Sequence, residues 1–362
     1  MTFWTNGLLG AITLTIPASV IIAYNGTIAS IPSGWYLCDG TNSTPNLTNK
    51  FIRCADDSTL NKGATGGSTT GQVTGSSSSE GGHGGIGGAA GTTLGGGGAV
   101  QYGTAGAHSH TLTGDMDWKP PSRELIYIKS YTSVNLPANA VVWRNDNSVP
   151  SNCSELTDLR DRFILGVGDN SRTQVGSDSR SVTLLTGSAG DHQHPGGNYQ
   201  PGGGGPGRGV TSGAHVHNSF SDTISVAKPS YHALLAVKID TTTGKFDKLI
   251  VAFDGAVSSI PSGWYLCNGN NTTPNLVGKM PIGKSGTLAL GATGGQNTAY
   301  SVNGSTGVPS ATVTHSHTAP SEEGSIGDHS SYAWAHSHAS WSGTADTLPL
   351  WHALPYIMYK AA

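Results

Sequence analysis

Paired histidines are the residues of this sequence whose type and spacing best fit a chemical role. The chain contains 14 histidines, whereas Asp, Glu, Lys and Arg together make up only 11% of its 362 residues. On a β-strand, residues two apart point to the same face, so a His-x-His pair presents two imidazoles in one direction. One pair cannot fill the coordination shell of a metal, but three pairs on a common axis would supply six nitrogens. Three such pairs precede a proline at matching positions: His108 and His110, His215 and His217, and His336 and His338.

The cofactor expected from these pairs is a transition metal ion. Six imidazole nitrogens form an octahedral set, which favours iron(II) or nickel(II), and zinc stays an alternative although structural zinc prefers four ligands. For a single pair, hydrogen bonding in a polar turn would explain the spacing equally well, but recurrence at one position favours the metal. A second series is incomplete, because the first part of the chain offers only His83 there, and it comprises His192, His194, His315 and His317.

An internal repeat organises the chain around these pairs. Residues 31–40 (Ile-Pro-Ser-Gly-Trp-Tyr-Leu-Cys-Asp-Gly) recur at 260–269 with Asn in place of Asp. Each copy is followed by Thr-Pro-Asn-Leu and then by Gly-Ala-Thr-Gly-Gly. A degenerate copy between them has Val-Pro-Ser at 149–151, and its residues 156–166 correspond to 47–54. In this alignment Cys54 of the first copy corresponds to Gly166 of the degenerate copy and to Gly283 of the last copy. Every copy ends on a His-x-His, a proline and a short apolar segment that closes on lysine, at 125–129, 234–238 and 354–360.

The repeat predicts three tandem small β modules, at residues 19–130, 134–240 and 247–362. The second module is degenerate, because it has lost the Gly-Trp-Tyr-Leu-Cys core. Gly-rich insertions at 81–98 and 196–209 should project as surface loops. Residues 1–18 are uncharged, and the alternation from Thr13 to Ile16 indicates a docking strand rather than a membrane span.

Composition points to an all-β protein and excludes several classes. Glycine, at 53 residues, is abundant, and no apolar stripe with a period of 3.6 residues persists, which argues against a helical protein. The 19 Lys and Arg are balanced by 22 Asp and Glu, which leaves no basic surface for nucleic acid. The net charge of −3 is too small to hold the chain open, so disorder is not expected.

The order of these motifs resembles the phage tail-collar domain of short tail fibres and related phage adhesins. The resemblance is strong in the first and third modules and partial in the second, and it covers most of the chain beyond residue 18. It implies a virion protein of the distal tail that attaches to a host cell-surface glycan, contacts other tail or baseplate proteins, and assembles as a trimer whose His-x-His pairs gather a metal. Family members usually carry one such domain, whereas this chain carries three and has no long shaft repeat.

Three modules in one chain leave two arrangements open. In a homotrimer, each module would meet its copies in the other chains and the metal sites would stack along the axis. In a monomer, the three modules would close into a pseudo-trimer with one main site. Three modules are the number that a pseudo-three-fold needs, and the linkers near 130–134 and 240–247 are short, so the monomer is favoured.

The function expected is therefore a structural tail-fibre or baseplate protein that mediates host attachment, with residues 1–18 contacting a neighbouring tail protein. One alternative is an adaptor or cap that joins tail proteins without binding the host. A polysaccharide hydrolase is disfavoured, because no carboxylate pair recurs between modules and no Gly-x-Ser-x-Gly motif is present. Aromatic residues around the last histidine pair could stack on receptor sugars or simply pack the tip: Tyr332, Trp334 and Trp341.

Several other residues are expected to be structural. Trp35 and Trp264 should anchor the module cores, because a buried indole contributes a large apolar area. Cys38 and Cys267 should be buried thiols, and a disulfide between Cys38 and Cys54 is an alternative. The histidines of the two His-Ala-Leu segments, His232 and His352, are expected to be core residues with satisfied hydrogen bonds.

Overall fold

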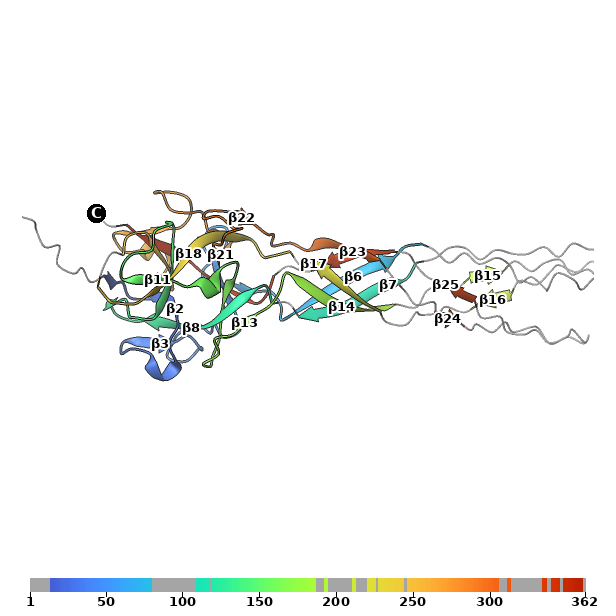
Figure 1. The fold of residues 1–362 in the computed structure, drawn as a ribbon, viewed down its shortest axis with the longest axis horizontal. Coiled ribbons are helices and arrows are strands. Elements are labelled where there is room, and N and C mark those ends of the chain that lie inside the picture. Colours follow the sequence, from blue (N-terminus) through green and yellow to red (C-terminus); the bar gives the residue numbers. More distant parts are fainter. Residues whose placement is uncertain are drawn as a thin grey trace, which may run out of the picture.

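The structure is a computed structural model that describes most of the chain. The described residues are 14–79, 109–117, 119–186, 192–194, 210–212, 220–225, 227–243, 246–305, 311–313, 334–336, 340–345 and 348–360. They form a wide head, a narrower stalk and, further along the long axis, two short hairpins (Figure 1).

The expectation of an all-β fold is confirmed. The described residues form β-strands and three single 3-10 turns, η1 (Ile28–Ser30), η2 (Thr157–Leu159) and η3 (Val257–Ser259), and no α-helix. Among these residues, a helix with the length and hydropathy of a membrane span is also absent.

Three short strands pair with one another in a ring at the centre of the head. They are β2 (Val20–Tyr24), β10 (Ala140–Arg144) and β19 (Leu249–Phe253), and every residue in them is buried. The end of β2 pairs with the start of β10, the end of β10 with the start of β19, and the end of β19 with the start of β2, always antiparallel. One chain therefore closes a cyclic, pseudo-three-fold arrangement of strands.

Each central strand also pairs with the closing strand of its own range. β2 pairs with β8 (Ser122–Ser130), β10 with β18 (Tyr231–Ile239), and β19 with β28 (Tyr356–Tyr359). The other edge of each closing strand holds a short strand, β3 (Trp35–Leu37), β11 (Cys153–Glu155) or β20 (Trp264–Leu266). Trp35 and Trp264 are buried there, as expected from the repeated motif.

The three ranges are interlocked rather than folded as separate modules. β12 (Phe163–Gly166) runs parallel to β8 of the first range, β21 (Met280–Gly283) parallel to β18 of the second, and β4 (Phe51–Cys54) parallel to β27 (Trp351–Leu354) of the third. The short strands β5 (Thr65–Gly66), β13 (Gln174–Val175) and β22 (Thr293–Gly294) pair antiparallel with β27, β8 and β18 in the same order. The sequence did not predict this exchange, because a pairing between distant ranges has no local signal.

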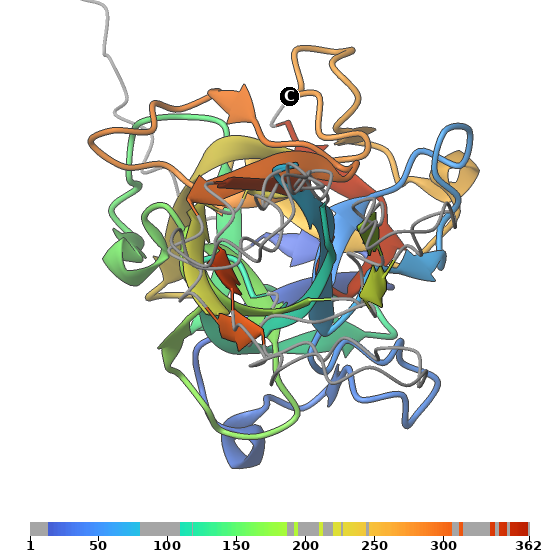
Figure 2. The ribbon, with the colours of Figure 1, turned by 90° about the vertical axis from the view of Figure 1, so that its right-hand side faces the viewer.

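The stalk is a ring of six strands, two from each range. Their order is β17 (Phe220–Ser225), β14 (Ser179–Thr186), β7 (Thr111–Asp117), β6 (Thr70–Ser77), β26 (Ser340–Ala345) and β23 (Tyr300–Ser305). The end strands β17 and β23 contact each other, and the Asp222 carboxylate of β17 lies where a Cβ on Gly304 of β23 would stand. Viewed along the axis, the strands surround a common centre (Figure 2).

Side chains alternate along the stalk strands between the inside and the solvent. In β6, for example, Gly71 and Val73 are buried, whereas Thr70, Gln72 and Thr74 are exposed. Small rings of strands have an interior that side chains must fill. Here the interior cluster combines Val73, Leu112, Met116, Val182, Leu184, Ile224, Val302, Trp341 and Ala345.

The remaining strands lie at the two ends of the molecule. β15 (His192–His194) pairs with β16 (Val210–Ser212), and β24 (Ala311–Val313) pairs with β25 (Trp334–His336), beyond the stalk (Figure 1). At the head, β1 (Thr15–Ile16) pairs with β9 (Val134–Asn135).

The described end of the 1–18 segment packs on its own chain. Leu14 and Ile16 are buried in the head core, whereas Thr15 is exposed, which confirms the alternation seen in the sequence. Residues 1–13 lie outside the described residues. The contact of residues 1–18 with another tail protein stays a prediction.

Candidate functional site

Most of the histidines predicted to bind metal lie outside the described residues. These are His108, His215, His217, His315, His317 and His338, and Tyr332 lies outside as well. The structure describes the backbone of three others: His192 and His194 form β15, and His336 ends β25, opposite Ala311.

His110 is the one predicted ligand whose side-chain position the structure describes. It lies just before β7 and is fully buried, on the same face as Leu112 and Met116, so it points into the stalk. Its backbone N–H donates to the Ser77 hydroxyl at 2.9 Å, and the Ser77 N–H donates back to the His110 carbonyl at 2.9 Å. An inward direction is the one that a metal on the stalk axis requires.

The fit of the residues to a metal rests on His110 and on the sequence. Among the described residues, no three His, Cys, Asp or Glu side chains converge as metal ligands would. The closing prolines are equivalent, since the carbonyls of Pro120, Pro229 and Pro349 lie against matching glycines. The spacing from the histidine pair to this proline differs between ranges, however. Because side chains alternate along a strand, a bulge or loop must compensate for that difference if all three pairs meet on one axis.

The structure corrects the assignment of Trp341 to a receptor-binding surface. Trp341 is only 2% exposed and fills the interior of the stalk, where its indole N–H donates to Asp222 Oδ2 at 2.9 Å. It is therefore a packing residue and cannot stack on a sugar ring. Trp334 lies in β25, opposite Val313.

The predicted core residues are in large part as expected. Cys38, Cys54, Cys153 and Cys267 are all buried free thiols, and burial raises the pKa of Cys54 to about 12, so these thiols are unreactive. His232 is buried, but its Nδ1 atom has no hydrogen-bond partner among the described residues, which differs from the satisfied histidine that was expected. Burial, together with the charge of Lys279, lowers the pKa of His232.

A buried ion pair that the sequence did not suggest joins the first and third ranges. Lys129, 6% exposed at the end of β8, lies 2.8 Å from Asp254 Oδ2, and Lys62 lies 2.9 Å from Oδ1. Burial would raise the pKa of Asp254, but hydrogen bonds from Lys129 and Lys62 outweigh burial and lower it. Because the three partners come from distant segments, only the three-dimensional structure reveals the cluster.

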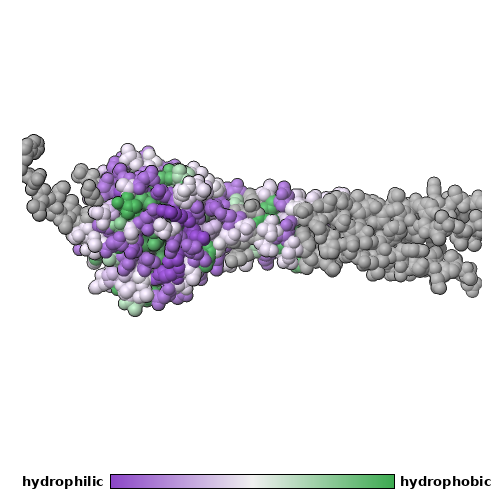
Figure 3. Space-filling view, viewed as in Figure 1, coloured by the Kyte–Doolittle hydropathy of each residue, from purple (hydrophilic) through white to green (hydrophobic). Residues whose placement is uncertain are grey.

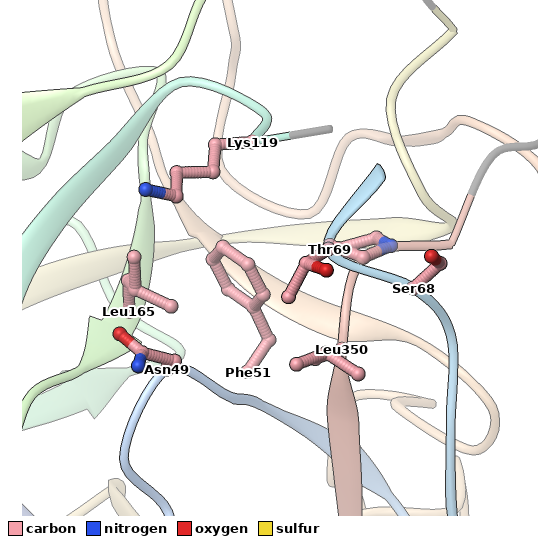
Figure 4. Close-up of a pocket in the computed structure, with 8 residues that line it drawn as sticks. Asn49, Phe51, Ser68, Thr69, Lys119, Leu165 and Leu350 are labelled. Atoms are coloured by element: carbon pink, nitrogen blue, oxygen red, sulfur yellow. The ribbon is translucent and has the colours of Figure 1, made fainter. Parts of the chain in front are cut away.

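A cavity of about 230 Å³ opens where the head meets the stalk (Figure 4). In the view of Figure 4, the Phe51 ring stands between the side chains of Lys119 and Thr69. One lining residue, Lys119, belongs to a Lys-Pro pair at 119–120 that recurs at 228–229, but this recurrence alone does not indicate a cavity. The lining residues are Asn49, Phe51, Ser68, Thr69, Lys119, Leu165, Pro349 and Leu350.

A scan against protein-family models, a search of curated proteins and a search of solved structures each found no match for this chain. The resemblance to tail-collar domains therefore rests on the motifs in the sequence.

Proposed function

We propose that this protein is a structural component of a phage tail, at the distal end of the virion, that mediates attachment to the host cell surface. The proposal is carried by the cyclic pairing of the three ranges, which gives one chain the pseudo-three-fold form of a fibre tip. The tail-collar motifs support the same function, because Trp35 and Trp264 of the repeated segment form equivalent parts of the head core.

The elongated shape and the surface composition agree with a tail tip. The stalk extends from the head along one axis, and the visible face of the head is mostly hydrophilic with small scattered apolar areas (Figures 1 and 3). Monomeric proteins rarely expose large contiguous apolar patches, and the described residues of this face form none. In this proposal one chain forms the pseudo-trimer, so the protein is a monomer in solution.

Binding of the labelled full-length chain to intact bacteria tests the attachment function. Saturable binding that unlabelled chain competes away supports an adhesin. Stable assembly with a purified tail protein, without any cell binding, supports the adaptor or cap instead. Release of soluble sugars from host envelope would indicate the polysaccharide hydrolase and overturn the assignment as a non-enzyme.

The proposed metal site comprises His108, His110, His215, His217, His336 and His338, and a bound iron(II), zinc or nickel(II) ion would crosslink the three ranges. Native mass spectrometry with elemental analysis tests this site together with the oligomeric state. A single chain of 37.0 kDa that carries one metal ion is expected. Changing both His108 and His110 to Ala should remove the metal and lower the Tm, whereas an unchanged metal content would contradict the proposal.

A further inference from the structure

Three equivalent corners surround the junction between head and stalk. At each corner the residue two positions before a parallel strand has a positive φ: Asn49 (57°), Asp161 (56°) and Gly278 (69°). The backbone N–H of each donates to a residue of the next range, namely to the carbonyls of Gly166, Gly283 and Cys54 at 2.7, 2.9 and 3.0 Å. The corners can therefore be compared residue by residue.

The second corner is closed by an ion pair. Lys228 Nζ lies 2.6 Å from Asp178 Oδ1, so the charge of the lysine is neutralised within the protein. Asp178 follows the glycine turn at Gly176. The equivalent position in the first range, after Gly67, is occupied by Thr69, and in the third range, after Gly295, by Asn297.

The third corner is closed by hydrogen bonds. Asn297 accepts a hydrogen bond from the backbone N–H of Ser230 at 3.1 Å and donates to the carbonyl of Gly278 at 3.0 Å. Arg53 donates to the same carbonyl at 2.9 Å, and its guanidinium lies over the Trp351 ring. The place of the lysine is taken by Leu348.

The first corner contains the cavity of about 230 Å³. It has a lysine, Lys119, at the position of Lys228, but no carboxylate at the position of Asp178. Lys119 is exposed at the rim, and among the described residues no ion pair is formed by it. Thr69 offers a hydroxyl where Asp178 offers a carboxylate at the second corner. The lining contains no acidic residue, so the cavity is complementary to an anion.

From this geometry we infer that the first corner is a binding site for a sugar unit that carries one anionic group. Lys119 would pair with the anionic group, and the amide of Asn49 and the hydroxyl of Thr69 would bind sugar hydroxyls. Of the apolar lining side chains, Phe51 and Leu165 are buried, and the partly exposed Leu350 would contact the C–H face of the ring. A cavity of roughly 150 Å³ holds a benzene molecule, so about 230 Å³ is enough for a six-membered ring with substituents.

This inference rests on the proposed function only for the source of the sugar, which would be the host envelope. Binding is therefore tested in solution, by ligand-observed NMR titration of the full-length chain with D-glucuronate, D-glucose 6-phosphate and D-glucose. At least one anionic sugar should bind about tenfold more tightly than glucose, the gain expected of one charge-assisted hydrogen bond. Preference between glucuronate and the phosphate identifies which anionic group the site takes.

Two variants and a matched control locate the binding. Lys119→Met should reduce binding of the anionic sugar to the level of glucose. Thr69→Asp should also abolish the preference, because it places a negative charge in the lining of the cavity, where it would repel an anionic group. Lys228→Met removes the equivalent lysine of the closed corner and should leave binding unchanged.

Equal binding of all three sugars, or equal effects of Lys119→Met and Lys228→Met, would overturn the site. If the chain binds the anionic sugar at the first corner but does not bind to intact bacteria, the proposed function is overturned instead. A circular dichroism spectrum of each variant checks that the strands have formed.

Discussion

The head and the stalk use strands from all three ranges, yet they are stabilised in different ways. In the head, central strands such as β2 are buried on both faces: Ile22 belongs to one apolar cluster and Ile21 to another. In the stalk, only the inner face is buried, and it includes glycines and the hydroxyl of Ser77 beside the larger side chains. Burial of apolar area therefore contributes more per residue in the head than in the stalk.

The head and the stalk are therefore expected to differ in stability. Strands buried on both faces read as continuous apolar runs, whereas strands with one solvated face alternate. The head is expected to be the last part to unfold, since its central strands are buried on both faces. The stalk should open at a lower free energy than the head. His110 lies at the end of the stalk that is farther from the head.

The largest effect is expected from removing the carboxylate that pairs with the buried Lys129. Asp254→Ala should lower the free energy of unfolding of the head by about 3–5 kcal/mol, because it leaves a buried ammonium without its partner. Asp240→Ala, which breaks the exposed pair with Lys238, should change it by less than about 1 kcal/mol. Urea unfolding followed by tryptophan fluorescence measures both.

The same variant predicts a pH dependence. The pKa of Asp254 in the folded protein is lowered, so its contribution is complete above the unfolded value of about 3.9 and is lost as the pH falls through the folded pKa. Wild-type stability should therefore drop in this acid range more steeply than that of Asp254→Ala. Parallel acid profiles would show that Asp254 does not stabilise the head.

A smaller and local effect is expected in the stalk. Trp341→Phe retains an aromatic ring but removes the hydrogen bond to the Asp222 carboxylate, which should cost about 1.5–3 kcal/mol. Hydrogen exchange of amides in β26 and β17 should accelerate while those of β2 remain protected. Equal acceleration in head and stalk would mean that the two regions unfold as one unit.

The smallest effect concerns His232 in the head. Its lowered pKa means that the unfolded chain binds a proton more readily, so stability falls as the pH drops from the unfolded value of about 6.5 through the folded pKa. His232→Gln should reduce the difference in urea midpoint between pH 7.5 and 5.5. Loss of metal from the proposed histidine site at the same pH is monitored separately by elemental analysis.

The sequence predicted the register of equivalent strands better than their partners. The alignment of Cys54 with Gly166 and Gly283 agrees with the structure, where they lie opposite Leu354, Leu125 and Leu234. The repeat marks these positions because a small residue recurs at each of them, Cys in the first range and Gly in the other two. That each strand pairs with a different range leaves no mark in the local sequence.

The burial of Trp341 could have been predicted from the alternation of residues around it. Ser340, Ser342 and Thr344 alternate with Trp341 and Ala345, which is the pattern of a half-buried strand and places the indole inside. Its position near a histidine pair suggested a surface role instead. The cavity beside Lys119 could not be predicted in the same way, because its lining joins residues from all three ranges.

The pairing of β4 with β27 has a consequence for how the protein is made. Phe51 and Ile52 lie opposite Trp351 and His352, so β4 emerges early from the ribosome while its partner is among the last segments translated. At roughly 5–20 residues per second, this apolar strand waits on the order of tens of seconds without its partner. During biosynthesis its unpaired edge is a place for chaperone binding or for misassembly with a second nascent chain.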